Sequence, residues 1–233
     1  MTDKNIEYEW LDRMGKLNKY NEWLFSHIKD YLGNSVWEAG AGIGTYSKCM
    51  SGVKFLFLSD VVDGYLKKLN MEFNNFNNVI VERIDLTNED YRKLQHYNID
   101  TVVCINVLEH VEHDLKAMEN IYKVLKNDGR FLFIGPNHPF LYGSLDKYAN
   151  HFRRYTKKGL TSSLNKIGFK IEKISVVNSL AAFNWFLQSK ILKRKIISEE
   201  GLEMCEKFIA LAKIVDRINP FPIGSNIVVI ARK

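Results

Sequence analysis

The sequence predicts an α/β protein whose mainly parallel β-sheet is covered by helices on both faces. Three observations lead to this prediction. From residue 35 onward, short apolar runs of strand length alternate with segments of helical periodicity. The first run leads directly into a glycine-rich turn, as first strands of such sheets often do. The 233 residues are 46% hydrophobic and 26% charged, which is typical of a folded domain with one added segment.

The predicted elements follow one another in a regular order. Residues 8–32 mix aromatic and aliphatic residues with charges at near-helical spacing, and Gly33 and Asn34 act as a stop. The expected strands cover residues 35–39, 54–59, 79–84, 101–106, 130–134, 169–177 and 227–231. One expected helix starts directly after Gly44. The other expected helices cover residues 62–73, 88–96, 114–125 and 160–167.

We expect residues 1–233 to form a single domain with two additions. Residues 1–33 would form an N-terminal helical cap. Residues 178–225 would form an insertion between the last two strands, largely helical until the Asn-Pro-Phe-Pro stretch at 219–222.

The glycine-rich turn has the pattern E-x-G-x-G-x-G, formed by Glu38, Gly40, Gly42 and Gly44. Glycines let the backbone and the following helix approach a ligand without interfering Cβ atoms, so a nucleotide-like ligand is expected. The dinucleotide fingerprint is G-x-G-x-x-G, and position 45 is Thr. The third glycine of an NAD site would therefore be displaced by one residue. As an alternative to ligand binding, the glycines could be needed for a tight turn packed against a neighbouring helix.

Two acids follow the next strands. Asp60 ends the second strand, where a carboxylate can accept hydrogen bonds from two ribose hydroxyls. Asp85 follows the third strand and could accept a hydrogen bond from an adenine amine, or could cap the following helix. Carboxyl ends of strands are where open α/β sheets bind ligands.

These residues resemble the class I S-adenosylmethionine-dependent methyltransferases, from about Tyr20 to the C-terminus. The resemblance also includes INVLEHVEHD at 105–114 and LKNDGRFLFIGPN at 125–137. HFRRYTKKGL at 151–160, followed by the Gly-Phe pair at 168–169, is similar to a subgroup often associated with small-molecule or glycan methylation.

The resemblance implies a Rossmann-like three-layer sandwich with strand order 3-2-1-4-5-7-6 and an antiparallel last strand. It implies that Glu38 and the glycine loop hold the methionine part, Asp60 the ribose and Asp85 the adenine, with Asn106 and Leu108 beside the sulfonium. The cofactor-binding set is then Glu38, Gly40, Gly42, Gly44, Asp60, Val61, Asp85, Leu86, Asn106 and Leu108. One departure is Trp37, where an aliphatic residue is more usual.

Methyl transfer from a sulfonium requires an aligned nucleophile and, for a hydroxyl, a group that takes its proton. His110 and His151 are the candidate bases, with loop orientation or helix capping as the alternative role. The predicted substrate-binding residues are His138, Arg153, Arg154 and Tyr155. The arginine pair could grip a phosphate or carboxylate, or could fix the loop after the fifth strand.

The function expected is O-methylation of a hydroxyl on a sugar, glycan precursor or secondary metabolite, with S-adenosylhomocysteine as the second product. An NAD-dependent oxidoreductase and a non-catalytic cofactor-binding partner subunit are the alternatives. A nucleic-acid methyltransferase is not favoured, because NVLEH at 106–110 differs from an Asn/Asp-Pro-Pro-aromatic pattern that receives a flipped base.

The formal charge of +6 reflects basic clusters at 147–158 and 190–195, which a solvated surface explains as well as an anionic substrate does. Residues 184–197 combine apolar side chains with four cations, so they could cover the cleft, form a dimer contact or touch anionic lipid. No metal-binding pattern stands out, so metal-independent transfer is expected. Three scattered cysteines and the lack of a signal or spanning segment favour a cytoplasmic protein. The oligomeric state stays open between a monomer and a homodimer.

Overall fold

The computed structural model describes residues 11–218 and 223–233. It contains a seven-stranded sheet in the order β3-β2-β1-β4-β5-β7-β6, which confirms the order implied by the resemblance. Strand β7 runs antiparallel to β5 and β6, and the other neighbouring pairs are parallel. The strands are β1 (Ser35–Ala39), β2 (Phe55–Asp60), β3 (Val79–Arg83), β4 (Thr101–Ile105), β5 (Arg130–Pro136), β6 (Lys170–Val177) and β7 (Asn226–Arg232).

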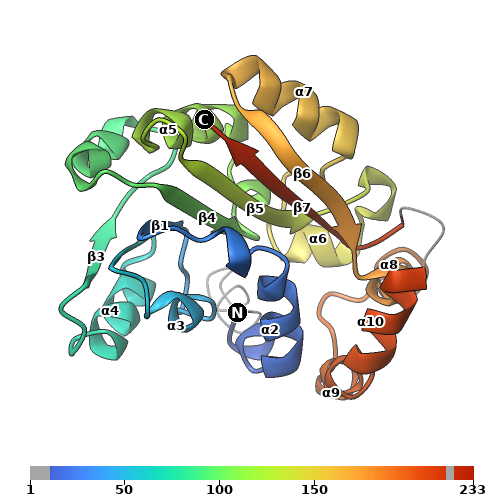
Figure 1. Ribbon diagram of the computed structural model, residues 1–233. Helices are drawn as coiled ribbons and strands as arrows, with labels where there is room; N and C mark the ends of the chain where they lie inside the picture. Colours follow the sequence, from blue (N-terminus) through green and yellow to red (C-terminus); the bar gives the residue numbers. More distant parts are fainter. Residues whose placement is uncertain (1–10, 219–222) are drawn as a thin grey trace.

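Helices cover both faces of this sheet (Figure 1). The α-helices are α2 (Asn18–Ser26), α3 (Ser47–Met50), α4 (Asp63–Glu72), α5 (Asp114–Val124), α6 (Ser144–Tyr148), α7 (Lys157–Ile167), α8 (Ser179–Phe186), α9 (Glu199–Lys207) and α10 (Ile209–Ile218). Short 3-10 helices are η1 (Lys29–Tyr31), η2 (Glu89–Tyr97), η3 (Leu108–His110) and η4 (Pro139–Leu141), and a π-helical turn η5 (Leu187–Ile191) continues α8. Figure 1 shows α5 and α7 on one face, with α2, α3 and α4 on the other.

Each face of the sheet has its own hydrophobic core. Successive strand residues enter opposite cores, as the period of two requires, so that Trp37 and Phe57 pack towards α5 while Val36 and Leu56 pack towards α2 and α4. The indole at Trp37 is fully buried, and its Nε1 donates a hydrogen bond to Ser59 Oγ at 2.8 Å. The unusual residue at this position is therefore accommodated without an unpaired donor.

The N-terminal region differs from the single helix predicted over 8–32. Among the described residues, 11–15 are helical, then α2 and η1 follow as separate pieces. The break occurs at Leu17, which is 5% exposed and packs against other buried apolar side chains instead of continuing the helix. Packing thus overrides the local periodicity here.

Two further predicted helices are shorter or tighter than expected. The helix after Gly44 is the four-residue α3, and the one predicted over 88–96 is the 3-10 helix η2. The predicted insertion contains α8, η5, α9 and α10, whereas the stretch 219–222 lies outside the described residues. The elements η4 and α6, between β5 and α7, were not predicted.

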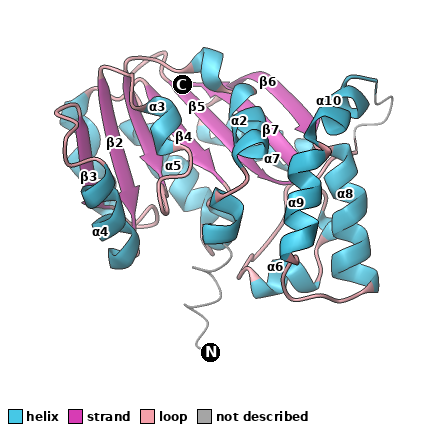
Figure 2. Ribbon diagram, turned by 90° about the horizontal axis from the view of Figure 1, so that it is seen from below, coloured by secondary structure: helices cyan, strands magenta, loops and turns pink. Residues whose placement is uncertain are grey.

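The insertion and the N-terminal region contact each other. Figure 2 shows α6, α8 and α9 grouped beside one end of the sheet. Glu206 of α9 accepts hydrogen bonds from the backbone nitrogens of Lys19 and Tyr20 at 3.2 and 3.0 Å. The Glu206 side chain therefore accepts from backbone N–H groups at the start of α2 that have no partner within the helix. These hydrogen bonds join two segments that are distant in sequence.

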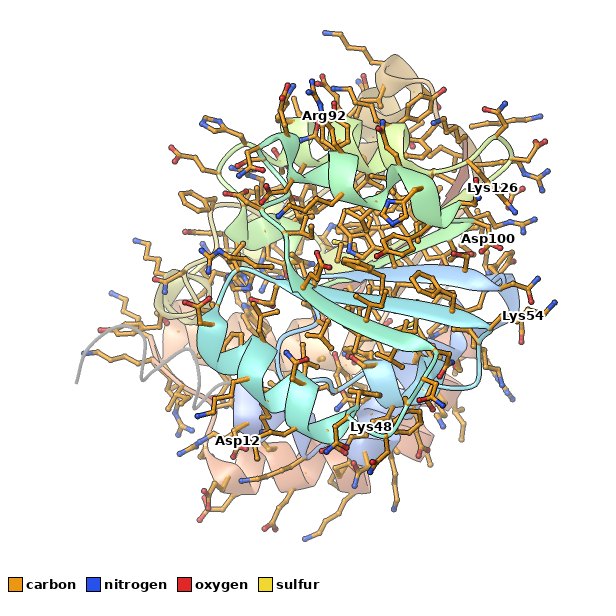
Figure 3. The ribbon with its side chains drawn as sticks, turned by 90° about the vertical axis from the view of Figure 1, so that its left-hand side faces the viewer. Asp12, Lys48, Lys54, Arg92, Asp100 and Lys126 are labelled. Atoms are coloured by element: carbon orange, nitrogen blue, oxygen red, sulfur yellow. The ribbon has the colours of Figure 1, made fainter. Side chains whose placement is uncertain are left out.

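The amino ends of the strands form the opposite edge, where Asp100 precedes β4. Its Oδ2 accepts hydrogen bonds from the backbone nitrogens of Asn34 and Ser35 at 3.0 and 3.2 Å, and Lys126 Nζ lies 3.6 Å away. Figure 3 shows Asp100 and Lys126 near each other, with Lys54 projecting outward at the same side. Within the described residues, no helix combines the length and apolar character needed to cross a membrane.

Candidate active site

Two cavities meet where β1 and β4 end. The first has a volume of about 200 Å³ and the second about 500 Å³. Gly40, Gly42, Asn106 and His110 line both cavities, so the two spaces are adjacent. The site therefore lies at the carboxyl ends of parallel strands, as is general for open α/β sheets.

The glycine loop after β1 adopts a conformation that requires glycine. Gly40, Gly42 and Gly44 have φ angles of +76°, +55° and +86°. A Cβ on Gly40 would lie 2.5 Å from Val107 Cγ2, which no side chain could occupy without displacement. Gly44 packs towards Leu69 and does not line either cavity, so only Gly40 and Gly42 present bare backbone to a ligand.

Asp60 at the end of β2 holds this loop in place. Its Oδ2 accepts a hydrogen bond from Gly42 N at 2.9 Å, and its Oδ1 accepts from Val61 N and Val62 N at 2.7 and 3.0 Å. Burial raises the pKa of Asp60, and the three backbone hydrogen bonds partly oppose that shift. Asp60 and Val61 both line the second cavity.

Asp85 does not cap the following helix, because Asn88 occupies the N-cap position of η2. The Oδ1 of Asp85 accepts hydrogen bonds from Thr87 N at 2.8 Å and Thr87 Oγ1 at 2.7 Å, so it shapes the turn after β3. Asp85 and Leu86 also line the second cavity. The acid is therefore both a turn residue and accessible to a ligand.

Glu38 is an acid buried beneath the glycine loop, with 3% of its surface exposed. Burial raises its pKa to about 8, although Ser47 Oγ donates a hydrogen bond to its Oε2 and opposes the shift. Ser47 is the first residue of α3. Glu38 lines the first cavity, where a cationic group would stabilise its ionised form.

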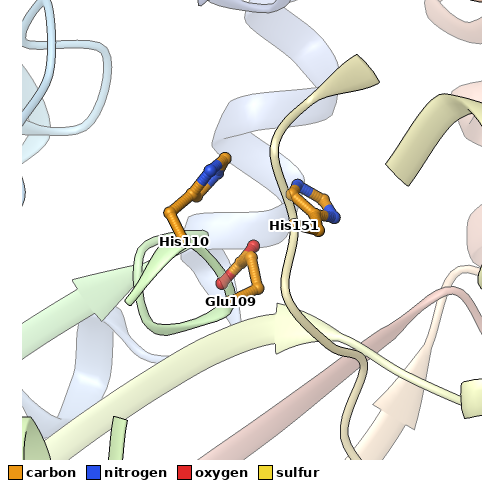
Figure 4. A group of neighbouring side chains, drawn as sticks. All are labelled: Glu109, His110 and His151. Carbon is orange, nitrogen blue, oxygen red and sulfur yellow. The ribbon is translucent and has the colours of Figure 1, made fainter. Parts of the chain in front are cut away.

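A cluster of Glu109, His110 and His151 lies in the first cavity (Figure 4). The first two residues belong to η3 after β4, and His151 follows α6. Figure 4 shows the two imidazole rings on either side of the Glu109 side chain. The ring centroids are 4.7 Å apart and the planes are nearly perpendicular, at 88°. The two candidate bases are thus brought together, with an acid that the sequence analysis did not select.

The environment of this cluster changes its ionisation. Burial, and to a lesser degree the charge of His151, lowers the pKa of His110 to about 3, so His110 is neutral at physiological pH. Burial raises the pKa of Glu109 to about 7, and its Oε2 has no hydrogen-bond partner among the described residues. A buried acceptor without a protein partner is rare, and this oxygen is able to accept from a bound molecule.

Asp146 of α6 organises the surrounding side chains and was not identified from the sequence. Its carboxylate is fully buried and accepts from Arg154 Nε at 2.7 Å and Trp185 Nε1 at 3.1 Å, and His151 Nδ1 lies 3.1 Å away. Burial alone would raise its pKa, but hydrogen bonding from His151 and the neighbouring Arg154 charge outweigh burial and lower it. The carboxylate is therefore ionised and orients His151.

The side chains of Arg153 and Tyr155 bind to other groups of the protein. Arg153 donates hydrogen bonds to the carbonyls of Val111 and Glu112 at 2.8 and 2.7 Å, and it pairs with Asp114. The Tyr155 hydroxyl also donates to Asp114, at 3.0 Å. These contacts correspond to the loop-fixing alternative that the sequence left open.

The remaining predicted residues are divided between the cavity and the core. Arg154 lines the first cavity, but it pairs with Asp146 and its guanidinium lies 4.6 Å from the Trp185 ring centroid. His138 packs against Phe140 and lies outside both cavity linings. Leu108 is completely buried in the core, so it supports the segment after β4 without facing either cavity.

Apolar side chains from both additions enclose the rest of the first cavity. They come from the N-terminal region, from α8 and from residues around α9. This lining consists of Leu11, Met14, Leu17, Tyr20, Ala181, Trp185, Ile197 and Leu202. The cavity therefore has a polar wall at the strand ends and an apolar wall beneath the helices.

The model of the methyltransferase domain family matches residues 9–174, and the chain belongs to this family. The family match confirms the methyltransferase domain expected from the sequence. The glycine spacing that argued against NAD agrees with this assignment.

Two curated relatives have low sequence identity to this chain. An uncharacterised protein of Methanocaldococcus jannaschii is 29% identical over 63% of this chain, and the matched region spans 58% of that protein, less than two thirds of it. The ubiquinone biosynthesis O-methyltransferase of Neisseria meningitidis is 26% identical over 66% of this chain and 68% of its own length.

Solved structures share the fold at low identity. An S-adenosylmethionine-dependent methyltransferase from Mesorhizobium loti has a TM-score of 0.62 at 14% identity, covering 93% of this chain and all of that one. One from Aquifex aeolicus has a TM-score of 0.61 at 15% identity, covering 100% of this chain and 98% of its own.

Proposed function

We propose that the protein methylates a hydroxyl oxygen of a small molecule that binds in the first cavity. The observation that supports this most directly is the position of the Glu109–His110–His151 cluster. It lies in the first cavity, and His110 also lines the second cavity beside the glycine loop. One group of the cluster therefore borders the junction between the two spaces, and the other two lie beside it in the first cavity, where they can handle a hydroxyl proton.

The residues around the junction fit the methyl donor. We assign the methionine part to Glu38, Gly40 and Gly42, because bare backbone and a buried acid suit an ammonium-bearing chain. The ribose is assigned to Asp60 and the adenine to the wall formed by Asp85 and Leu86. Once bound, S-adenosylmethionine supplies an already activated methyl group on a sulfonium.

The chain's own contribution is alignment and proton handling. The acceptor oxygen forms its bond to the methyl carbon as the carbon–sulfur bond breaks, leaving a neutral thioether, and the hydroxyl proton must leave. His151 is better oriented for this step than His110, because Asp146 fixes its Nδ1 side and leaves Nε2 available. The low pKa of His110, about 3, makes that imidazole a weak base.

The shape of the first cavity supports an acceptor with an apolar part. Apolar side chains such as Met14, Trp185 and Ile197 face the polar cluster across this space. A hydroxylated secondary metabolite suits such a wall better than an unsubstituted sugar does. The similarity to a ubiquinone biosynthesis O-methyltransferase is compatible with O-methylation of a molecule of this kind.

The proposal can be tested with radiolabelled S-adenosylmethionine and a panel of hydroxylated apolar compounds, each paired with its amine and thiol analogues. Label should enter the hydroxyl compounds, and His151→Ala should lower turnover at least a hundredfold while S-adenosylhomocysteine binding stays within about threefold. Exclusive labelling of the amine or thiol analogues would contradict the proposal, as would an unaffected His151→Ala variant.

We also propose that the outer side of residues 184–197 contacts anionic membranes. Trp185 faces the cavity, whereas Ile191 and Leu192 are 60% and 49% exposed among the cations at 190–195. Vesicles containing phosphatidylglycerol should retain the protein in a flotation assay at low salt, and Ile191→Ser with Leu192→Ser should release it. Absence of wild-type binding would refute this contact.

A further inference from the structure

The acceptor cavity contains a set of side chains with the composition of a metal site. Ligand atoms of Glu109, His110 and His151 all lie within 4.8 Å of one another. We propose that these three residues bind a divalent transition-metal ion. This inference rests on the proposed function and changes one step of it, because the ion, rather than a free imidazole, activates the hydroxyl. It also departs from the metal-independent transfer expected from the sequence.

Glu109 provides the first independent support. The residue is 1% exposed, and its Oε2 lacks a hydrogen-bond partner among the described residues. A carboxylate in this position requires a cation or donor to offset its desolvation. The Glu109 carboxylate lies between the two imidazoles (Figure 4), and one of its oxygens is within 4.8 Å of a nitrogen of each, so one ion could contact all three side chains.

His151 provides the second support through Asp146. The contact of 3.1 Å between His151 Nδ1 and Asp146 Oδ1 leaves Nε2 as the available nitrogen. Metal-bound histidines commonly donate their other ring N–H to a carboxylate in this way, which fixes the tautomer and the ring orientation. Asp146 would therefore position the ligand without touching the ion.

The charges around the cluster favour a cation. Arg154 is the nearby buried cation, and Asp146 pairs with it at 2.7 Å. Because Asp146 neutralises Arg154, this guanidinium offers little repulsion to an ion held by Glu109. A tetrahedral ion with bonds of about 2.1 Å separates its ligands by about 3.4 Å, so ligand atoms that lie within 4.8 Å of one another need to approach by up to about 1.4 Å.

The ligand types select the metal class. Two imidazoles and one carboxylate suit Zn²⁺, Co²⁺, Mn²⁺ or Fe²⁺, whereas Mg²⁺ and Ca²⁺ prefer oxygen ligands. Three protein ligands leave at least one coordination position open to the cavity, where the acceptor hydroxyl would bind. Coordination lowers the pKa of that hydroxyl, so its proton passes to solvent before the oxygen attacks the methyl group.

Metal binding can be measured in the absence of the methyl donor and the methyl acceptor. Tag-free protein is stripped with chelator, dialysed and titrated with Co²⁺ and Zn²⁺, using the Co²⁺ absorption spectrum and calorimetry as readouts. We expect one ion per chain, and Glu109→Gln and His151→Ala should each weaken binding at least a hundredfold. His96→Ala changes an exposed histidine and should match wild type. Circular dichroism and S-adenosylhomocysteine binding verify that each variant is folded.

Three outcomes would overturn the metal site: no stoichiometric ion in the wild type, unchanged affinity in Glu109→Gln, or equal loss in His96→Ala. Full methyl transfer by stripped protein in the presence of chelator would also overturn it, while leaving the proposed O-methylation intact. Conversely, a bound ion in a protein that methylates only amines would remove the proposed function and keep the site.

Discussion

His151 Nδ1 lies 3.1 Å from Asp146 Oδ1, and the same carboxylate oxygen accepts from Arg154 Nε at 2.7 Å. One buried acid therefore orients the imidazole that faces the acceptor cavity and neutralises the arginine beside it. Through its other oxygen it also accepts from Trp185 Nε1 at 3.1 Å, which attaches α8 to this network. The segment between β5 and α7 thus positions His151 beside Glu109 and His110, the cluster proposed to act on the acceptor.

Asp146→Asn should lower both stability and turnover. The change leaves the Arg154 guanidinium, 2% exposed, without its counter-charge, so the free energy of unfolding should fall by about 3 kcal/mol. Loss of the fixed orientation of His151 should lower kcat roughly 10- to 100-fold with little change in S-adenosylhomocysteine affinity. Urea denaturation and steady-state kinetics measure the two effects.

Asp63→Asn is the matched control, because Asp63 pairs with Arg83 at the surface and its side chain is 89% exposed. Its effect on unfolding should stay within about 0.5 kcal/mol. Equal stability of the two variants would show that Asp146 does not hold the network together.

Gly40→Ala should weaken cofactor binding by distorting the loop. The added Cβ would meet Val107 Cγ2 at 2.5 Å, at a φ of +76° that L-residues avoid. We expect a cost of about 1–3 kcal/mol, visible as a lower melting temperature and weaker S-adenosylhomocysteine binding. Gly52→Ala serves as control, since a Cβ there meets nothing within 4 Å. Adding Val107→Ala should recover the steric part of the loss, and no recovery would mean that the contact is not the cause.

Asp60→Ala should weaken S-adenosylhomocysteine binding about 10- to 1000-fold. The side chain accepts three backbone hydrogen bonds that shape the loop, and its proposed bonds to ribose are charge-assisted, at about 1.5–3 kcal/mol each. Calorimetry compares it with Asp63→Ala, three residues further along the chain, which should bind as the wild type does. Similar affinities in both variants would remove Asp60 from the cofactor site.

Cofactor binding should depend on pH through Glu38. The pKa of this buried acid is about 8, so in the free protein it is mostly protonated at pH 7. A bound ammonium favours the carboxylate, so binding releases a proton and affinity should rise by up to about tenfold per pH unit between pH 6 and 7.5. Calorimetric titration of S-adenosylhomocysteine across this range should give that slope in wild type. Glu38→Gln should bind more weakly with a flat profile; a slope that persists in this variant would assign the proton to another group.

Much of the fold was already determined by the sequence, because strand alternation and glycine turns are local properties. The residues at 35–44, Asp60 and Asp85 predicted a parallel sheet and its ligand edge, whereas the strand order found in the structure was implied by the family resemblance. The single helix that local periodicity predicted over residues 8–32 was wrong, because burial of Leu17 breaks it.

Only the tertiary structure placed Glu109 and Asp146 with the two histidines. Glu109 lies in the INVLEHVEHD segment at 105–114, but its pattern did not mark this acid, and Asp146 stands in no such segment. The elements η3 and α6 are too short for periodicity to reveal which side chains converge. Packing around β5 brings Glu109, His110, Asp146, His151 and Arg154 together. Burial there shifts the pKa of Glu109 and His110, whereas hydrogen bonding from His151 and the Arg154 charge lower the pKa of Asp146. The sequence by itself thus determined the sheet and the cofactor edge, through short-range pattern. The acceptor chemistry depends on long-range contacts and burial, which the chain acquires only when folded.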